Sequence, residues 1–190
     1  NARLFEPDDT VEIPINSGRL SITLDWRWWV GGADGRVRPV SLSLGAAYVT
    51  AHGTHGAVQL PDNRGQLDKE PWLMVASGSP RSADAGQDRL IVNLDNHSVF
   101  ERIDVYAFIS MGSATWIGCE AWINIAGPFP APIEYRIDPH ADGQAAIGLL
   151  RIVSGATGCT IKRLNRFGAD QAELDSKLDW GLEWRIAPLG

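Results

Sequence analysis

The sequence lacks the features that would place it among disulfide-rich, membrane-spanning or secreted proteins. Its 190 residues contain only two cysteines, Cys119 and Cys159, which are too few for a disulfide framework and do not form a C-x-x-C pair. No apolar run approaches the ~20 residues of a membrane-spanning helix, and the polar, acidic start does not have the form of a signal peptide. We therefore expect two buried thiols in a cytoplasmic protein with no membrane span.

Positive charge and the common catalytic motifs are also scarce. The formal net charge is −6, Arg greatly outnumbers Lys, and no stretch collects five or more basic residues. Because phosphate contacts need a clustered positive surface, this pattern argues against a nucleic-acid-binding protein. The sequence has no G-x-S-x-G nucleophile motif, no P-loop and no Rossmann fingerprint. We expect a protein that is not an enzyme.

Short strand-like segments separated by turns make up most of the chain. Val11–Ile15 predicts an edge strand and Arg19–Asp25 alternates apolar with polar residues, whereas the apolar run Arg102–Ser110 predicts a central strand buried on both faces. Gln171–Leu178 is the best helix candidate, and Gly181–Ile186 predicts a last strand. The pattern indicates an all-β protein: a two-sheet antiparallel β-sandwich with one short helix near the C-terminus.

The length fits a single domain. Asn1-Ala2, with no Met before it, is typical of a cleaved-tag remnant, which would make the chain a domain cut from a longer protein. The residues that follow are acidic. We therefore predict a tag remnant and a loose N-terminal segment over residues 1–18, and the β-sandwich domain over residues 19–190.

The stretch Ser77–Leu94 has the composition of a chemical site. It begins as a loop rich in Gly, Ser and Ala that carries Asp84 and Asp88, and it continues into a strand. Carboxylates on such a loop commonly hold Ca²⁺, but two solvated acids in an exposed turn explain the same composition. Ser41 and Ser43 share one face of another predicted strand. Their hydroxyl oxygens could form half of a metal-binding site, but without the negative charge of carboxylates. An ordinary half-exposed strand face explains the two serines equally well.

Three of the eight tryptophans, Trp26, Trp28 and Trp29, directly follow one predicted strand. In an extended chain Trp26 and Trp28 point to one face and Trp29 to the other, so at least one is a candidate for an exposed contact surface. Exposed tryptophans would stack on sugars or clamp a peptide, whereas buried ones are core side chains. The other tryptophans lie mostly within strand patterns that favour burial.

A series of segments, taken in order, carries a resemblance to a known family. The most specific is Glu173-Leu174-Asp175 followed by Trp180-Gly181-Leu182-Glu183-Trp184. The others are VSLSLGAAY (40–48), GAVQL (56–60), Ser77–Leu94, RIDVYAFIS (102–110) with Trp116, PIEYR (132–136) and AAIGLLRI (145–152). From about Leu20 to Arg185 the chain resembles the bacterial tellurium-resistance (Ter) stress-response family, and its TerA-like branch more than TerD itself.

The resemblance implies a β-sandwich with no established catalysis that works in assemblies. Typical members hold Ca²⁺ with acids from an Asp-x-Asp strand and an acidic loop. The corresponding positions here are Ser41 and Ser43 in the strand and Ser79, Pro80 and Arg81 in the loop, with Asp84 and Asp88 as remaining acids. Since calcium affinity follows ligand charge, the loss of four carboxylates predicts a degenerate site, with no cofactor or at most weakly bound calcium.

The function that we predict is therefore a non-catalytic Ter-type stress-response domain acting through protein–protein interaction. Its partners would be other Ter-family members or the rest of its own longer chain. The contact surface would lie near Trp26–Trp29 or along the proline-rich segment Pro128–Pro132. The alternative is a small-ligand or carbohydrate-binding β-sandwich module that uses exposed tryptophans. A hydrolase would need converging carboxylates or a Ser–His pair, and the sequence shows neither arrangement.

Overall fold

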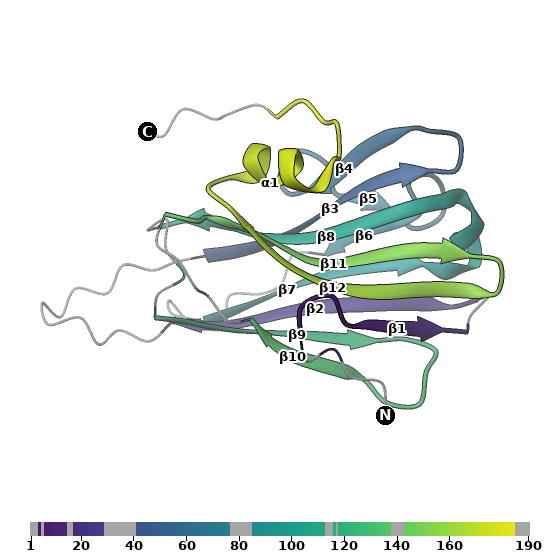
Figure 1. The fold of residues 1–190 in the computed structure, drawn as a ribbon, viewed down its shortest axis with the longest axis horizontal. Helices are drawn as coiled ribbons and strands as arrows, with labels where there is room; N and C mark the ends of the chain where they lie inside the picture. Colours follow the sequence, from purple (N-terminus) through teal and green to yellow (C-terminus); the bar gives the residue numbers. More distant parts are fainter. Residues whose placement is uncertain are drawn as a thin grey trace, which may run out of the picture.

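In the computed structural model the chain forms two antiparallel sheets that pack face to face (Figure 1). The structure describes residue 4 and residues 6–14, 17–28, 41–76, 85–112, 116, 118–137 and 143–184. Two packed sheets are the natural solution for strands with one apolar face, because each sheet covers the apolar face of the other. The predicted β-sandwich with one short C-terminal helix is confirmed.

The first sheet contains the central strand that the sequence predicts to be buried on both faces. The order of its six strands is β1 (Thr10–Ile13), β12 (Gly158–Gly168), β11 (Ala146–Gly155), β8 (Phe100–Met111), β3 (Ser41–Thr50) and β4 (His55–Gln59). In β8, Ile103 and Val105 belong to the main core between the sheets, whereas Tyr106 and Phe108 belong to a second apolar cluster. Both faces of β8 are therefore buried, as predicted.

The second sheet lies opposite the first and presents its other face to the outside. The order of its six strands is β10 (Ile133–Ile137), β9 (Cys119–Ala126), β2 (Arg19–Trp28), β7 (Ala85–Asn93), β6 (Leu73–Ala76) and β5 (Gly65–Gln66). A 3-10 helix, η1 (Leu94–Val99), connects β7 to β8 across the sandwich. In β2 the apolar residues Leu20, Ile22 and Leu24 are buried in the main core, as the alternation predicts.

Both cysteines are buried and unpaired, as expected from their number. Burial, with a smaller contribution from the neighbouring Glu120 carboxylate, raises the pKa of the Cys119 thiol to about 12. Burial also raises the pKa of Cys159. Because the thiolate is the reactive form, both side chains behave as small hydrophobic residues.

Within residues 1–18, where a loose segment is expected, the described residues include an edge strand of the sandwich. Strand β1 pairs with β12 as the predicted edge strand, and Leu4 is fully buried. The guanidinium of Arg163 in β12 donates hydrogen bonds to the carbonyls of Leu4 and Arg136, both at 3.2 Å. Since Arg136 lies in β10, this side chain links the edges of the two sheets. The described part of the segment therefore packs against the domain that was expected to begin at Arg19.

The helix α1 (Gln171–Leu178) covers the outer face of the first sheet (Figure 1). Its first turn has reciprocal caps: the Asp170 carboxylate accepts from the Glu173 amide, and the Glu173 carboxylate accepts from the Ala169 amide, both at 2.8 Å. Leu174 and Leu178 are buried against the second apolar cluster. A helix of about two turns is marginal alone, so this burial stabilises it. Among the described residues, no helix is long and apolar enough to cross a membrane.

The strand predicted over Gly181–Ile186 is not formed in its described part, residues 181–184. The reason is the buried Asp175 carboxylate, which takes the N–H groups that a strand would offer to a sheet. It accepts hydrogen bonds from the amides of Trp180 (3.1 Å), Gly181 (2.9 Å) and Leu182 (2.9 Å) and from the indole of Trp184 (2.7 Å). Gly181 has φ of 69°, which glycine adopts readily. The C-terminal signature therefore folds a cap rather than a strand.

A buried ion pair anchors this cap to the first sheet. Asp104 in β8 is 1% exposed and receives two hydrogen bonds from the Arg151 guanidinium, both at 2.7 Å. The indole of Trp180 donates to the same carboxylate at 2.8 Å, and its ring lies 5.0 Å from that of Tyr106. The hydrogen bonds to Asp104 hold the pKa of Arg151 above its usual value. The ion pair thus fixes the tryptophan that closes the second cluster.

Candidate functional site

Of the predicted calcium-site residues, Ser41, Ser43 and Asp88 lie within the described part of the chain. Ser79, Arg81 and Asp84 lie outside the described residues, so a site that includes them stays a prediction. Asp88 is buried between the sheets, and its carboxylate accepts hydrogen bonds from the amides of Leu44 (2.8 Å) and Arg89 (3.1 Å). The backbone of β3 therefore lies directly against this acid.

The two predicted serines in β3 point away from Asp88. Leu42 and Leu44 belong to the main core, so Ser41 and Ser43, which alternate with them, face the outside of the first sheet. Their oxygens are used locally: the Ser43 hydroxyl donates to the Ser110 hydroxyl, which donates to the Ser41 carbonyl, both at 3.1 Å. Among the described residues, no three His, Cys, Asp or Glu side chains gather into a metal-binding group.

The position of Asp88 has a structural explanation. The pairing of β3 with β4 begins at Gly45, opposite Gln59, so the amide of Leu44 lies just past the end of that ladder. A buried amide needs an acceptor, and the Asp88 carboxylate supplies it from the opposite sheet. The acid thus holds the two sheets together where β4 no longer covers β3.

Calcium is accordingly expected to have little effect on stability. At 0.5 mM Ca²⁺, a site with a dissociation constant of about 1 mM adds only ~0.2 kcal/mol, which moves the melting temperature by less than about 1 °C. Thermal unfolding with and without Ca²⁺, with Mg²⁺ as control, measures this. The variant Asp88→Asn should melt lower by the same amount in both conditions. A rise of several degrees at sub-millimolar Ca²⁺ in the unsubstituted chain would contradict the prediction.

Two of the three tryptophans predicted as a contact surface lie within the described residues. Trp26 and Trp28 are half-buried and pack against the main core, and Trp29 lies outside the described residues. The ring of Trp26 lies over Gly86 in β7: a Cβ placed on this glycine would come within 2.2 Å of it. Glycine is therefore required at that position for the ring to pack. Trp26 also lines a shallow hollow together with Trp122, and the contact surface over Trp26, Trp28 and Trp29 stays a prediction.

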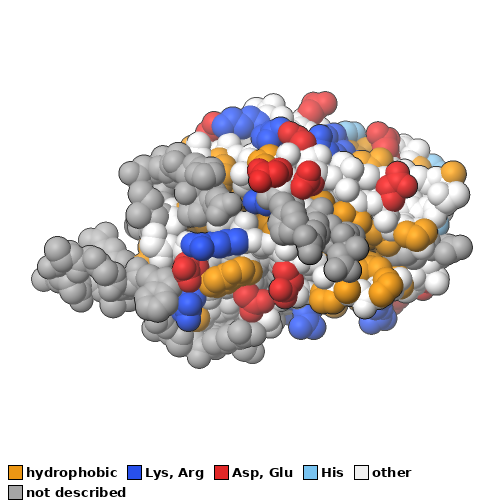
Figure 2. Space-filling model, turned by 60° about the horizontal axis from the view of Figure 1, so that its bottom comes forward, with side chains coloured by type: hydrophobic (Ala, Val, Ile, Leu, Met, Phe, Trp, Pro, Cys, Tyr) orange, Lys and Arg blue, Asp and Glu red, His pale blue; other side chains and the backbone are white. Residues whose placement is uncertain are grey.

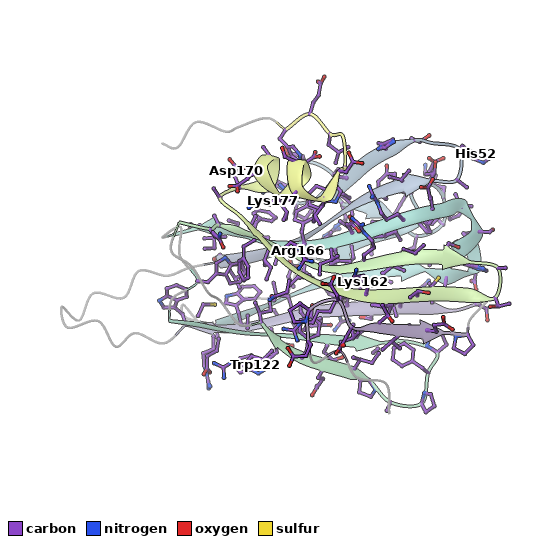
Figure 3. All side chains as sticks on the ribbon, in the orientation of Figure 1. His52, Trp122, Lys162, Arg166, Asp170 and Lys177 are labelled. Carbon is purple, nitrogen blue, oxygen red and sulfur yellow. The ribbon has the colours of Figure 1, made fainter. Side chains whose placement is uncertain are left out.

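Trp122 is the tryptophan that the second sheet exposes. Its side chain is 36% exposed, whereas its neighbours Ala121 and Ile123 are buried. Figure 3 labels it on the lower side of the molecule, where β9 and β10 lie. The expectation of burial for strand tryptophans is wrong here, although the alternation of Ala121, Ile123 and Ile125 already indicated that Trp122 points outward.

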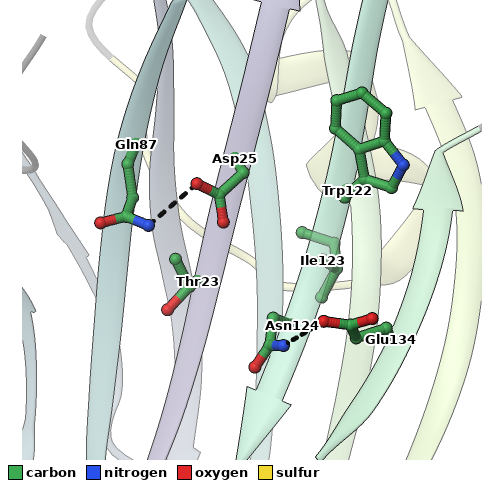
Figure 4. A pocket seen from close by; sticks show the side chains of 7 residues that line it. All are labelled: Thr23, Asp25, Gln87, Trp122, Ile123, Asn124 and Glu134. Atoms are coloured by element: carbon green, nitrogen blue, oxygen red, sulfur yellow. Dashed lines mark hydrogen bonds between the residues drawn. The ribbon is translucent and has the colours of Figure 1, made fainter. Parts of the chain in front are cut away.

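A shallow hollow of about 420 Å³ lies beside this tryptophan on the outer face of the second sheet. Gln87 donates an amide hydrogen bond to the Asp25 carboxylate at 2.9 Å, and Asn124 donates one to the Glu134 carboxylate at 2.7 Å. Figure 4 shows these two pairs on either side of the hollow. The lining residues are Thr23, Asp25, Gln87, Trp122, Ile123, Asn124 and Glu134. Sequence reasoning singled out none of the polar ones, because they come from four strands.

The proline-rich connection between β9 and β10 forms an exposed apolar turn. Pro128, Pro130, Ala131 and Pro132 are exposed, and Phe129 is half-buried against the main core, which anchors the turn. Figure 2 shows hydrophobic side chains gathered toward the right-hand end of this face, the end where the connection lies in Figure 1. Four of the five residues of this predicted contact surface are therefore exposed.

Comparison with known proteins identifies the fold. No protein-family model matches the chain, and no curated protein matches it in sequence. Among solved structures, the protein of unknown function SAV2460 covers 89% of this chain and all of its own, with a TM-score of 0.61 at 14% identity. SCO6318 from Streptomyces coelicolor A3(2), a homologue of the telluride resistance protein TerD, covers 84% of this chain and 96% of its own, with a TM-score of 0.53 at 15% identity.

The protein therefore has a TerD-like β-sandwich fold. The likeness extends over nearly the full length of both solved structures, in agreement with the resemblance found in the sequence. At these identities it establishes the fold alone. The closer similarity to the TerA-like branch stays a prediction from the sequence.

Proposed function

We propose that this chain is a non-catalytic, cytoplasmic stress-response domain of the Ter type that works by binding other proteins. The observation that supports this most is the TerD-like fold, shared with a homologue of a telluride resistance protein over 84% of this chain and 96% of that one. The ordered C-terminal signature agrees with it, because in the structure its acids and tryptophans build the cap over the first sheet.

The use of the buried acids favours a binding rather than a catalytic role. Asp88 and Asp175 accept hydrogen bonds from backbone amides, and Asp104 is paired with Arg151. Carboxylates held in this way stabilise the fold and have little freedom to move a proton on a substrate. On this view a degenerate calcium site leaves the protein to recognise its partners through surface shape.

The proline-rich turn Pro128–Pro132 is the surface that we propose for this contact. It is apolar and exposed, and its three prolines restrict the backbone before binding. A segment that is already restricted loses less conformational entropy when a partner covers it. The partner that we propose is a second Ter-type protein.

A pull-down with TerD-type proteins of the same genome tests this proposal. The variant Pro130→Glu, which places a charge in the turn, should lower partner recovery at least fivefold because an unpaired buried charge opposes association. Met111→Glu is the matched control, since Met111 is 65% exposed at the far end of the sandwich, and it should leave recovery unchanged. Equal recovery with both variants would remove the turn as the contact surface. Failure of every Ter-type protein to bind would count against the proposed function.

A further inference from the structure

We propose that the hollow beside Trp122 binds a neutral, polyhydroxylated ring, that is, a carbohydrate. This site lies on the outer face of the second sheet and is separate from the proline-rich turn. Carbohydrate binding at this site would be a second function, and it does not depend on the proposed protein-binding function.

Strand register places two rows of outward side chains next to each other. Each row contains one residue from each of the strands β10, β9, β2 and β7, and each residue is paired with its neighbour on the next strand. The second row is displaced from the first by two residues along every strand. In the middle of the second row, Thr23 is the shortest side chain and leaves the hollow between its taller neighbours (Figure 4). The first row is Arg136, Trp122, Asp25 and Gln87, and the second is Glu134, Asn124, Thr23 and Arg89.

The polar groups around the hollow are held in place before any ligand arrives. Each amide uses one N–H to hold a neighbouring carboxylate: Gln87 holds Asp25, and Asn124 holds Glu134. Within the described part of the chain, the carbonyl oxygens of Gln87 and Asn124 accept no side-chain hydrogen bond, so they remain available to hydroxyl groups. Side chains restricted in this way lose little conformational entropy when they bind a ligand.

The chemistry of the lining matches a sugar ring. A pyranose has an apolar C–H face, which the exposed indole of Trp122 can cover, and a rim of hydroxyls that both donate and accept. The two carboxylates supply acceptors, and the two amides and the Thr23 hydroxyl supply both donors and acceptors. The volume of about 420 Å³ falls within the ~300–1,000 Å³ of small-molecule sites.

Other ligand classes fit the lining less well. No Lys or Arg is among the described residues that line the hollow, although Arg89 belongs to the second row and Arg27 lines an adjoining hollow that shares Asp25 and Trp122. The two carboxylates of the lining disfavour a phosphate or another anion. Nearby, Arg27 and Arg136 both pair with the Glu120 carboxylate, at 3.3 and 3.5 Å. The two acids would attract a cation, but cation-binding cages use several aromatic rings. Among the described residues Trp122 is the one aromatic side chain of this lining, and Trp26 lines the adjoining hollow.

Calorimetric titration of the full chain with neutral oligosaccharides tests the proposal. The panel consists of cello-, xylo-, malto-, manno- and chito-tetraose, with choline as a cationic probe and inorganic phosphate as an anionic one. We expect millimolar or tighter binding of at least one oligosaccharide. Binding should weaken about tenfold in Trp122→Ala and be retained in Trp122→Phe, which keeps an aromatic face. Gln87→Ala should weaken it as well, and Met111→Ala should not change it.

A structural readout accompanies the titration. In a chain with ¹⁵N-labelled indoles, the Trp122 signal, assigned as the one missing in Trp122→Phe, should shift with the bound sugar. The proposal is overturned if no oligosaccharide binds at 10 mM, if binding is unchanged in Trp122→Ala, or if only choline or phosphate binds. None of these results depends on partner recovery, so failure of this site is distinguishable from failure of the protein-binding function.

Discussion

Replacing Asp104 by Asn is expected to lower the free energy of unfolding by about 3 kcal/mol. The carboxylate is 1% exposed, is the bidentate partner of Arg151 and lies 3.8 Å from the guanidinium of Arg102, so both arginines would lose this counter-charge. Removal of one member of a buried ion pair typically costs 3–5 kcal/mol. We take the lower end of this range because the Arg151 side chain is 25% exposed and retains some contact with water. Urea unfolding followed by circular dichroism measures the change.

Glu120→Gln is the matched control for this substitution. Glu120 also pairs with two arginines, but its side chain is 28% exposed and the side chains of Arg27 and Arg136 are about half exposed, at 51% and 56%. Ion pairs at the surface contribute ~0–1 kcal/mol, so this variant should lose less than about 1 kcal/mol. The double variant Asp104→Asn with Arg151→Gln should lose less than the sum of its single changes, since the two side chains interact. Similar losses for Asp104→Asn and Glu120→Gln would show that burial does not strengthen the inner pair.

Asp175→Asn is expected to release the C-terminal cap while leaving the sandwich folded. In the native chain both carboxylate oxygens accept hydrogen bonds, from the amides of Trp180, Gly181 and Leu182 and from the indole of Trp184. An amide group would turn one acceptor into a donor that faces other donors. Hydrogen bonds to a charged group contribute about 1.5–3 kcal/mol each, though not additively, so local release becomes the lower-energy response. The amides of Trp180–Leu182 should exchange hydrogen roughly 100-fold faster.

The neighbouring variant Asp179→Asn provides the control for the cap. Asp179 has φ of 59°, in the left-handed region that Asn also tolerates, and it contributes its carbonyl rather than its side chain to Arg102. Its substitution should leave exchange at Trp180–Leu182 within about twofold. Release of the cap in Asp175→Asn should also expose Tyr106 and Phe108, which a dye that binds apolar surface would detect. Unchanged exchange in Asp175→Asn would show that the tryptophan packing alone holds the segment.

The two predictions concern the same feature, a set of contacts within one molecule rather than a binding site. In the sequence, the motif Glu173-Leu174-Asp175 with Trp180–Trp184 indicated a family resemblance. The structure shows which contacts the residues of this motif make. Asp175 folds the segment, and Trp180 connects it to Asp104 in β8. The helix and the cap bury part of the outer face of the first sheet, whereas the outer face of the second sheet carries the hollow beside Trp122.

Properties that depend on neighbouring residues along the chain were predictable from the sequence. Alternation in Arg19–Asp25 predicted which face of β2 is buried, and the apolar run Arg102–Ser110 predicted that both faces of β8 are covered. The scarcity of cysteine predicted buried, unpaired thiols. These predictions hold because side-chain direction in a strand is set by the backbone of that strand alone.

Properties that depend on strand order could be decided only by the tertiary structure. The order β10-β9-β2-β7 places Glu134, Trp122, Asp25 and Gln87 around one hollow, although they are far apart in the chain. The packing of β7 under β3 brings Asp88 to the main core side of β3, while Ser41 and Ser43 point to the other side. The competition between Asp175 and a sheet edge for the same amides turned the predicted last strand into a cap. Contacts between distant segments follow from how whole sheets pack, which no spacing along the chain records.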